Sequence, residues 1–226
     1  ADMCSRTAAA ESNERRIENS FTVMLSTNRG ERLPLEMLVS LYSKVSSVHR
    51  IVVLWLDAAT LPTIQSEPDR PVPLYVYAAS TSSRNNRFLP LEIVRTAGVL
   101  LVDDDVVASP EDLAAAFLLW KSDPNRLLGP FVAAHIAPSA ATSTSMRYEY
   151  LPVHFGAPLY TNPGAGLRYN RATMERYTMA LTKLLFVPSR LFFLYTCLLP
   201  RQIHAYVDDA SAVAECEDIA MNLLAS

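Results

Sequence analysis

The sequence lacks three features that would place it in a well-marked class of protein. Its 226 residues contain no run of about 18 apolar residues, so no segment is predicted to span a membrane. Three cysteines are too few for a disulfide scaffold and show no metal-ligand spacing. The formal net charge of -3 offers no basic surface for nucleic acid. Half of the residues are hydrophobic, which predicts a globular protein with a sizeable core.

Common nucleotide and catalytic motifs are also missing. The sequence contains neither the GxxxxGK[ST] loop of phosphate-binding NTPases nor the GxSxG turn of serine hydrolases. Gly164 and Gly166 lack a third glycine and follow no convincing strand, so we interpret them as part of a loop. The four histidines have no zinc-site spacing. A nucleotide site in this chain must therefore be built from other residues.

The chain is expected to form one domain after a polar leading segment. Residues 1–20 are polar and charged, and they lack the apolar segment of a secretory signal peptide. We expect them to be a disordered lead-in or the remnant of a stem from a longer precursor. Residues 21–226 are expected to form a single domain, with a nucleotide lobe to about residue 129 and an acceptor lobe after it.

Strand and helix signals alternate along the chain and predict an α/β domain around a mostly parallel sheet. The predicted strands cover residues 21–27, 50–56, 74–78 and 98–102. The predicted helices cover residues 32–45, a segment beginning at 109, and segments near 188–196, 199–207 and 217–224. Ser109 suits an N-cap and Pro110 the first helical position, with Leu113, Phe117 and Trp120 on one face. Residues 137–166 are expected to be a binding loop or partly disordered.

Three consecutive aspartates, Asp103, Asp104 and Asp105, follow the apolar run GVLLV directly. Adjacent carboxylates repel one another and are costly to bury without a partner, and a divalent cation removes both problems. Carboxylate oxygens suit Mg²⁺ or Mn²⁺, which are often shared with substrate phosphates. Residues two apart point the same way in an extended chain, so Asp103 and Asp105 are predicted to work as a pair. The alternative is an acidic turn that caps the helix starting at Ser109.

Several segments, in this order, resemble the exostosin-like glycosyltransferases of family 64. They are FTV at 21–23, IVVLW at 51–55, SSRNNRFLP at 82–90, VLLVDDD at 99–105, DL at 112–113 with Phe117 and Trp120, YTMALT at 177–182 and CEDIAMN at 216–222. The last of these is the most specific. The resemblance implies the GT-A nucleotide-sugar transferase fold, a UDP-sugar donor, and Mn²⁺ or Mg²⁺ as cofactor.

The resemblance also implies roles for individual residues. Asp105 matches the metal-binding aspartate, Asp218 matches an acid of the catalytic region, and Arg87 is expected to assist at the diphosphate. The residues expected around the donor are Arg29, Asp57, Asn86, Arg87, Asp103 and Asp104.

The chain departs from the family pattern in three places. The family continues for many tens of residues beyond CEDIAMN, so its C-terminal part is expected to be missing here. Ala133 stands where the family often has an arginine two residues before the histidine that His135 matches. Lys183 and Leu184 replace a small Gly-Ala pair. The last two changes lie on the acceptor side, so they bear on the acceptor more than on the donor.

The function implied is a metal-dependent, retaining glycosyltransferase. It would move an N-acetylhexosamine or a related sugar from a UDP-sugar to a glycan or glycoconjugate acceptor in the lumen of the Golgi or endoplasmic reticulum. Homo- or hetero-oligomerisation stays open. Two alternatives also stay open. One is a haloacid-dehalogenase-type phosphatase, in which Asp208, Asp209 and Lys183 would complete a site begun by Asp103 and Asp105. The other is a catalytically weak partner subunit with a glycosyltransferase fold.

The resemblance pairs the cysteine of CEDIAMN with one in the missing tail, so Cys216 is expected to be unpaired. Cys4 lies in the polar lead-in, where ordering the chain costs conformational entropy. Cys197 lies in an apolar helical run, where a cysteine is usually a small buried hydrophobe. The helix that follows Asp218 is then expected to be held less firmly than in relatives with the tail.

Overall fold

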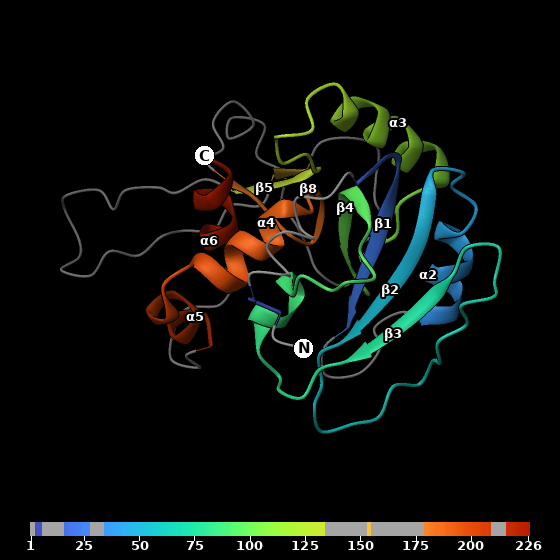
Figure 1. The fold of residues 1–226 in the computed structure, drawn as a ribbon. Coiled ribbons are helices and arrows are strands. Elements are labelled where there is room, and N and C mark those ends of the chain that lie inside the picture. The colour runs from blue at the N-terminus through green and yellow to red at the C-terminus, as the bar shows by residue number, and fades with distance from the viewer. Residues whose placement is uncertain (1–2, 6–15, 28–33, 134–152, 155–178, 209–215) are drawn as a thin grey trace.

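The computed structural model describes residues 3–5, 16–27, 34–133, 153–154, 179–208 and 216–226. Figure 1 shows the described elements arranged around a twisted sheet. Their bounds are β1 (Ile17–Thr27), α2 (Leu35–Tyr42), β2 (Val48–Trp55), β3 (Leu74–Ala78), η1 (Arg84–Phe88), β4 (Thr96–Asp103), α3 (Pro110–Lys121), β5 (Phe131–Ala133), β6 (Val153–His154), β7 (Met179–Ala180), β8 (Leu184–Pro188), α4 (Arg190–Phe193), η3 (Leu194–Leu198), α5 (Arg201–Asp208) and α6 (Cys216–Ala225).

The main sheet has five strands in the order β3-β2-β1-β4-β8. Strands β1 to β4 run parallel to their neighbours, and β8 pairs antiparallel with β4 at one edge. A separate three-stranded antiparallel sheet has the order β6-β5-β7. The predicted α/β fold with a mostly parallel sheet is therefore confirmed. The strand that ends at Asp103 lies between β1 and β8, inside the sheet as predicted.

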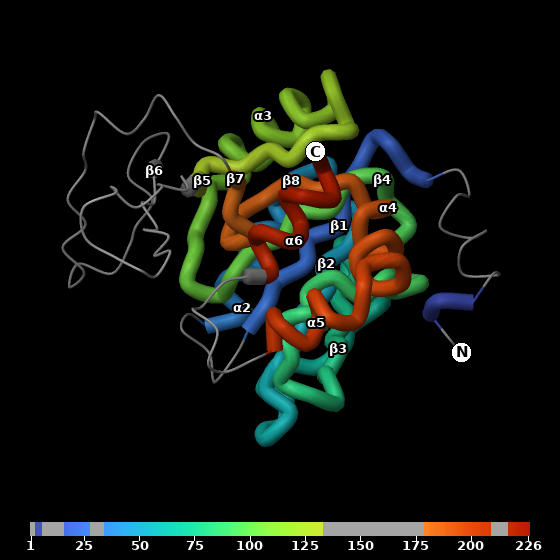
Figure 2. The backbone as a smooth tube through the Cα atoms, turned by 90° about the vertical axis from the view of Figure 1, so that its left-hand side faces the viewer, coloured from blue at the N-terminus to red at the C-terminus, as the bar shows by residue number. Residues whose placement is uncertain are grey.

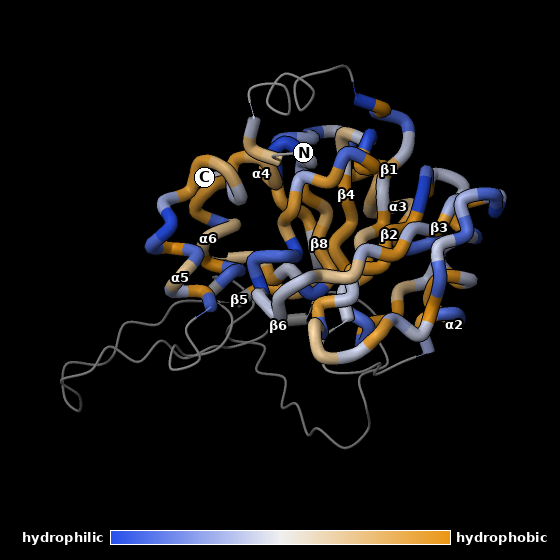
Figure 3. The backbone as a smooth tube through the Cα atoms, turned by 60° about the horizontal axis from the view of Figure 1, so that its bottom comes forward, coloured by the Kyte–Doolittle hydropathy of each residue, from blue (hydrophilic) through white to orange (hydrophobic). Residues whose placement is uncertain are grey.

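Helices pack against both faces of the main sheet, and successive side chains of a strand point to opposite faces, so each strand contributes to two cores. Val23 and Leu25 join a core shared with α2 and α3, whereas Met24 joins a second core with α4, η3 and α6. Figure 2, which looks onto the side of α4, α5 and α6, shows these helices in front of the strands. This two-sided burial explains why the strands are almost continuously apolar, which Figure 3 shows as orange tubes in β1, β4 and β8.

Helix α3 begins as predicted from its first residues. The Oγ atom of Ser109 accepts a hydrogen bond from the backbone N–H of Asp112 at 3.0 Å, and Pro110 occupies the first turn. The predicted apolar face is buried as well, with Trp120 lying against Gly98 of β4. A Cβ atom at position 98 would lie 2.7 Å from the indole ring, so the strand needs glycine there. The described helices include none that is both long and apolar enough to cross a membrane.

Two segments differ from their predicted structure. Strand β1 begins at Ile17, four residues before the predicted start, because its first residues also pair with β4. Residues 184–188, which the sequence did not predict as a strand, form β8 with all five residues buried. The helical segment predicted near 188–196 is confirmed, and it consists of the short α4 followed by the π-helical turn η3. Strand β8 could form at the edge of the sheet because only one side of β4 is paired with β1.

The expectation for the cysteines is wrong in one respect. Cys4 and Cys197 form a disulfide across a sequence separation of 193 residues, with their Cα atoms 5.4 Å apart. Neither the polar neighbours of Cys4 nor the apolar ones of Cys197 prevented this pairing, because the cost of closing a loop grows only slowly with its length. Since the chain has three cysteines, the bond leaves no second cysteine within this chain for Cys216.

Candidate active site

A cavity of about 240 Å³ lies at the carboxyl ends of β1, β2 and β4, where parallel α/β sheets bind their ligands. Five carboxyl and three basic side chains line it, so its formal charge is negative. Its described lining residues are Ser26, Thr27, Leu56, Arg84, Arg87, Asp103, Asp104, Asp105, Leu181, Thr182, Lys183, Glu217 and Asp218.

Arg87 and Asp103 form a close ion pair in the wall of the cavity. Arg87 donates from one terminal nitrogen to Asp103 Oδ1 at 2.5 Å and to the carbonyl of Thr182 at 3.1 Å. Burial raises the pKa of Asp103 to about 6, with Arg87 opposing and the charge of Asp105 reinforcing the shift. Burial would lower the pKa of Arg87, yet nearby carboxylates, first of all Asp103, outweigh it and raise that pKa. Arg87 therefore stays a cation and holds Asp103 in place.

The other two aspartates differ in their surroundings. Asp104 is buried, and its Oδ2 accepts a hydrogen bond of 2.6 Å from the hydroxyl of Thr27 at the end of β1. The side chain of Asp105 is 22% exposed, and its Oδ2 is 3.0 Å from Nζ of Lys183. All three aspartates line the cavity: Asp104 bonds to the scaffold, while Asp103 and Asp105 each have a cation beside them. The alternation expected of an extended chain does not apply here, because β4 ends at Asp103 and the next two aspartates lie in a turn.

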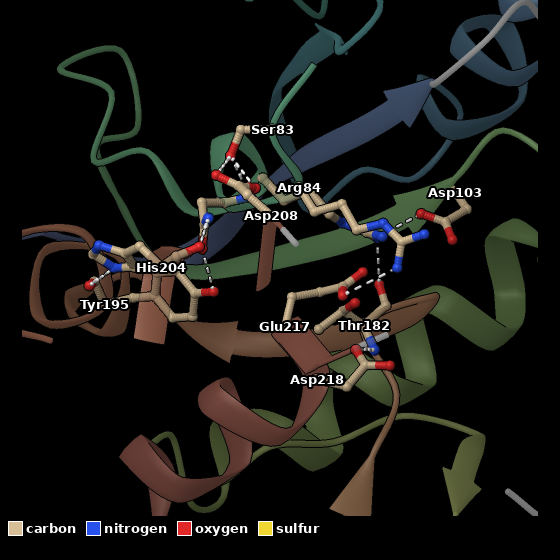
Figure 4. A network of polar contacts seen from close by, with 11 residues as sticks. Ser83, Arg84, Asp103, Thr182, Tyr195, His204, Asp208, Glu217 and Asp218 are labelled. Carbon is tan, nitrogen blue, oxygen red and sulfur yellow. Dashed lines mark hydrogen bonds and ion pairs between the residues drawn. The ribbon is translucent and has the colours of Figure 1, made fainter. Parts of the chain in front are cut away.

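Helix α6 brings the CEDIAMN segment to the opposite wall. Asp218 is buried, and its Oδ1 accepts a 2.8 Å hydrogen bond from the backbone N–H of Thr182. One turn later, the side-chain amide of Asn222 bonds to both the N–H and the carbonyl of Ala180, at 2.9 and 2.7 Å. Residues four apart share a helix face, so this one face fixes the backbone between β7 and β8. Figure 4 shows Asp218 directed towards Thr182.

The structure adds two residues that the sequence did not point out. Glu217 is 4% exposed, and its Oε2 lies 3.6 Å from Arg84, which also lines the cavity. Burial, with help from the charge of Asp218, raises the pKa of Glu217. Arg84 and Arg87 lie three residues apart in η1, so both reach the cavity. In the sequence, the three-residue spacing of Arg84 and Arg87 and the position of Glu217 next to Asp218 were the features that could have identified these two residues.

Two predicted donor residues, Asp57 and Asn86, are not among the described residues that line the cavity, and the position of a third is not described. Arg29 lies outside the described residues, as does His135. Asp57 follows β2, but its carboxylate accepts hydrogen bonds from the N–H of Ala59 and the hydroxyl of Thr60 in its own loop, both at 2.9 Å. The side chain of Asn86 donates instead to the carbonyl of Thr81 at 2.7 Å. Their proposed contacts with a donor stay predictions.

The arrangement expected of a phosphatase does not form among the described residues. Lys183 does lie beside Asp105, as that alternative required. Asp208 however accepts hydrogen bonds from the hydroxyl of Ser83 at 2.7 and 2.9 Å and is not a described lining residue of the cavity. Figure 4 shows Asp208 beside Ser83 and apart from Asp103. Asp209 lies outside the described residues.

The donor set fits a divalent cation that shares its coordination with a ligand. Within the described part of the chain, no group of three or more His, Cys, Asp or Glu side chains is arranged to hold a metal ion. Mg²⁺ in particular is usually held by one or two carboxylates together with substrate phosphates and water. Asp103 and Asp105, which face the cavity with hard oxygen atoms, provide that number.

The sequence matches known proteins over most of its length. Residues 21–226 match the glycosyl transferase family 64 domain. The chain belongs to this family. It is 28% identical to Exostosin-like 2 of Mus musculus over 209 residues, which make up 91% of this chain and 57% of the relative. It is also 28% identical to Glycosyltransferase family protein 64 C3 of Arabidopsis thaliana over an alignment of 234 positions, which covers 100% of this chain and 64% of the relative.

A third relative, Exostosin-1a of Danio rerio, is 31% identical over 193 residues, covering 85% of this chain and 23% of the relative. The chain spans about three-fifths of the length of the first two relatives. The family 64 match includes every described residue that lines the cavity.

Proposed function

We propose that this family 64 chain is a metal-dependent, retaining glycosyltransferase. The donor would be a UDP-sugar carrying an N-acetylhexosamine or a related sugar, and the acceptor a glycan or glycoconjugate. The observation that carries the proposal is the cavity at the strand ends, which is lined by the Asp103–Asp105 segment, Arg87 and Asp218 together. The resemblance to exostosin-like enzymes supports the UDP-sugar and the retention of anomeric configuration.

The charges of the cavity support a metal-bound donor. A bare diphosphate would be repelled by five carboxyl side chains. A Mn²⁺ or Mg²⁺ ion held by Asp105, with Asp103 beside it, would neutralise this repulsion and stabilise the diphosphate as it leaves. Arg87 would place a fixed positive charge near the same phosphates.

In the reaction, the bond between the anomeric carbon and the diphosphate breaks, and UDP leaves with the electron pair. The acceptor oxygen bonds to that carbon, and its proton passes to a phosphate oxygen or to water. Asp218 is held by the N–H of Thr182 at the opposite wall, and we assign it to the region of the anomeric carbon.

UDP release from a panel of UDP-sugars, with and without a chelator, tests this function. We expect release from one N-acetylhexosamine donor and no release with chelator. Asp105→Asn should abolish Mn²⁺-dependent UDP binding in a thermal-shift assay while the circular dichroism spectrum stays unchanged. Asp112→Asn is the matched control, because Asp112 is an exposed carboxylate in the first turn of α3. Equal UDP affinity in Asp105→Asn and the wild type would contradict the assignment.

We also propose that the protein acts in the lumen of the Golgi or endoplasmic reticulum. The Cys4–Cys197 disulfide supports this location, because such bonds persist in oxidising compartments. Tagged full-length protein should coincide with a Golgi or endoplasmic reticulum marker, and a cytosolic distribution would contradict the proposal.

A further inference from the structure

The ammonium group of Lys183 lies at the carboxylate to which the metal is assigned. Its Nζ atom is 3.0 Å from Asp105 Oδ2, a charge-assisted hydrogen bond. The same Nζ lies 5.9 Å from the ring centroid of Phe131, at the limit of a cation–π contact. Lys183 therefore occupies an oxygen that a divalent cation would use.

The fold places Lys183 there through the pairing of β8 with β4. The register sets Leu184 opposite Val102, so Lys183 comes next to Asp103. The carbonyl of Lys183 accepts a 3.0 Å hydrogen bond from the N–H of Asp103, which fixes the backbone of the lysine. Its four-carbon side chain then extends across the acidic segment to Asp105. The pairing of β8 with β4 therefore sets the position of Lys183 beside the acidic segment.

The ion pair is accessible enough to exchange. The side chain of Lys183 is 36% exposed and that of Asp105 is 22% exposed, whereas the nearby Arg87 is 11% exposed. Breaking a partly exposed pair costs little, because water solvates both charges. Lys183 can therefore leave Asp105 when a stronger partner arrives, while Arg87 stays with Asp103.

We propose that Lys183 is a tethered cation that competes with the divalent ion for Asp105 until the donor arrives. This inference rests on the proposed function. A metal ion and an ammonium group repel each other when they share one carboxylate, so Lys183 weakens metal binding to the free protein. The diphosphate of the donor gives Lys183 a new anionic partner in the same cavity. Metal and donor consequently bind with positive coupling, each raising the affinity of the other.

The first test measures Mn²⁺ binding to the whole chain without nucleotide, by the loss of the free Mn²⁺ signal in electron paramagnetic resonance. Lys183→Met should tighten Mn²⁺ binding about tenfold, and Lys183→Arg, which keeps the charge, should leave it unchanged. Lys121→Met is the matched control. Lys121 is the last residue of α3, donates a hydrogen bond to Asn19 of β1, and is not a described lining residue of the cavity. Adding Asp105→Asn to Lys183→Met should remove the gain.

Equal Mn²⁺ affinity in the wild type and Lys183→Met would overturn the proposal, as would no binding by either. A similar gain in Lys121→Met would also overturn it. Should Lys183→Met fail to fold, Lys183→Gln and Lys183→Gly remove the same charge, and the same expectation applies to them.

The second test adds UDP. In the wild type UDP should raise Mn²⁺ affinity about tenfold more than in Lys183→Met, because the lysine must be displaced only in the wild type. If UDP changes Mn²⁺ affinity in neither protein, the proposed donor is wrong. The competition between Lys183 and Mn²⁺ is then still decided by the titration without nucleotide, so the two failures are distinguishable.

Discussion

Asp103 and Asp105, which end and follow β4, and Asp218 in α6 are held in the cavity by different means. On the β4 wall, Asp103 and Asp105 are paired with the basic side chains of Arg87 and Lys183. On the α6 wall, Asp218 is buried and accepts a hydrogen bond from the backbone N–H of Thr182. A side-chain cation can be exchanged for a ligand, whereas a backbone amide cannot move away. We infer that Asp105, whose pair with Lys183 is partly exposed, is placed for ligand exchange, and that Asp218 is placed for position.

Arg87 joins the two walls, so its removal should have the largest effect. Arg87→Met leaves Asp103 without its cation and the carbonyl of Thr182 without a donor. Breaking a buried ion pair costs about 3 kcal/mol, so the free energy of unfolding should fall by about that amount at pH 7. Urea denaturation measures the change.

Arg84→Met is the matched control for this substitution. Arg84 is 40% exposed and lies 3.6 Å from Glu217, and burial raises the pKa of Glu217, so this carboxylate can take up a proton when the cation is removed. The loss of Arg84 should therefore cost less than the ~3 kcal/mol expected for Arg87. If both variants lost the same stability, Arg87 would not be the link between the two walls.

Two substitutions of Asp218 test its structural role and its chemical role separately. Asp218→Ala leaves the buried N–H of Thr182 without its acceptor and should cost about 2 kcal/mol of unfolding free energy. Asp218→Asn keeps a carbonyl oxygen as acceptor, so it should cost less than about 1 kcal/mol. Sugar transfer should fall about 100-fold even in the Asn variant, because the charge is gone.

Thermal unfolding and UDP release, measured on the same samples, check both parts of the Asp218 prediction. Wild-type stability in Asp218→Ala would contradict its structural role, and full transfer in Asp218→Asn would contradict its chemical role.

The pH dependence of the free energy of unfolding should report on the protonation of Asp103. The pKa of Asp103 is raised from an ordinary value of 3.8 to about 6 in the folded protein. The folded state therefore binds more protons than the unfolded state between these values, and this contribution to stability is lost as pH rises through about 6. Asp103 is 26% exposed, so water screens part of the effect.

Asp103→Asn removes this titration. Compared with the wild type, the variant should gain relative stability between pH 4.5 and pH 7.5 when both are studied without metal. Thermal denaturation at the two pH values measures the difference. A constant difference between the two proteins at both pH values would show that Asp103 keeps an ordinary pKa.

Asp105 should give the smallest effect on stability. Asp105→Asn breaks a partly exposed pair with Lys183 but also removes a negative charge that raises the pKa of Asp103. These contributions oppose each other, so the free energy of unfolding should change by less than about 0.5 kcal/mol. Differential scanning calorimetry checks this value. If the free energy of unfolding fell as much as is expected for Asp218→Ala, Asp105 would be as important to stability as Asp218, and the two residues would not differ as proposed.

Local sequence patterns were sufficient for much of the fold. The apolar and aromatic segment 74–78 predicted β3 with its observed bounds, and the apolar run before Asp103 predicted a buried interior strand. Ser109 and Pro110 predicted the start of α3 to the residue. These features depend on backbone preferences and hydrogen bonds within a few residues, which the sequence specifies directly.

Partners far apart in the chain could not be predicted in this way. Strand β8 forms because β4 offers it an open edge, and its register brings Lys183 to Asp105, 78 residues away. The bond between Cys4 and Cys197 likewise depends on two distant segments meeting. By itself the sequence determined the α/β class, the acidic strand end and the CEDIAMN helix. Tertiary structure alone decided which cation faces each carboxylate, because charge pairing depends on distance in space.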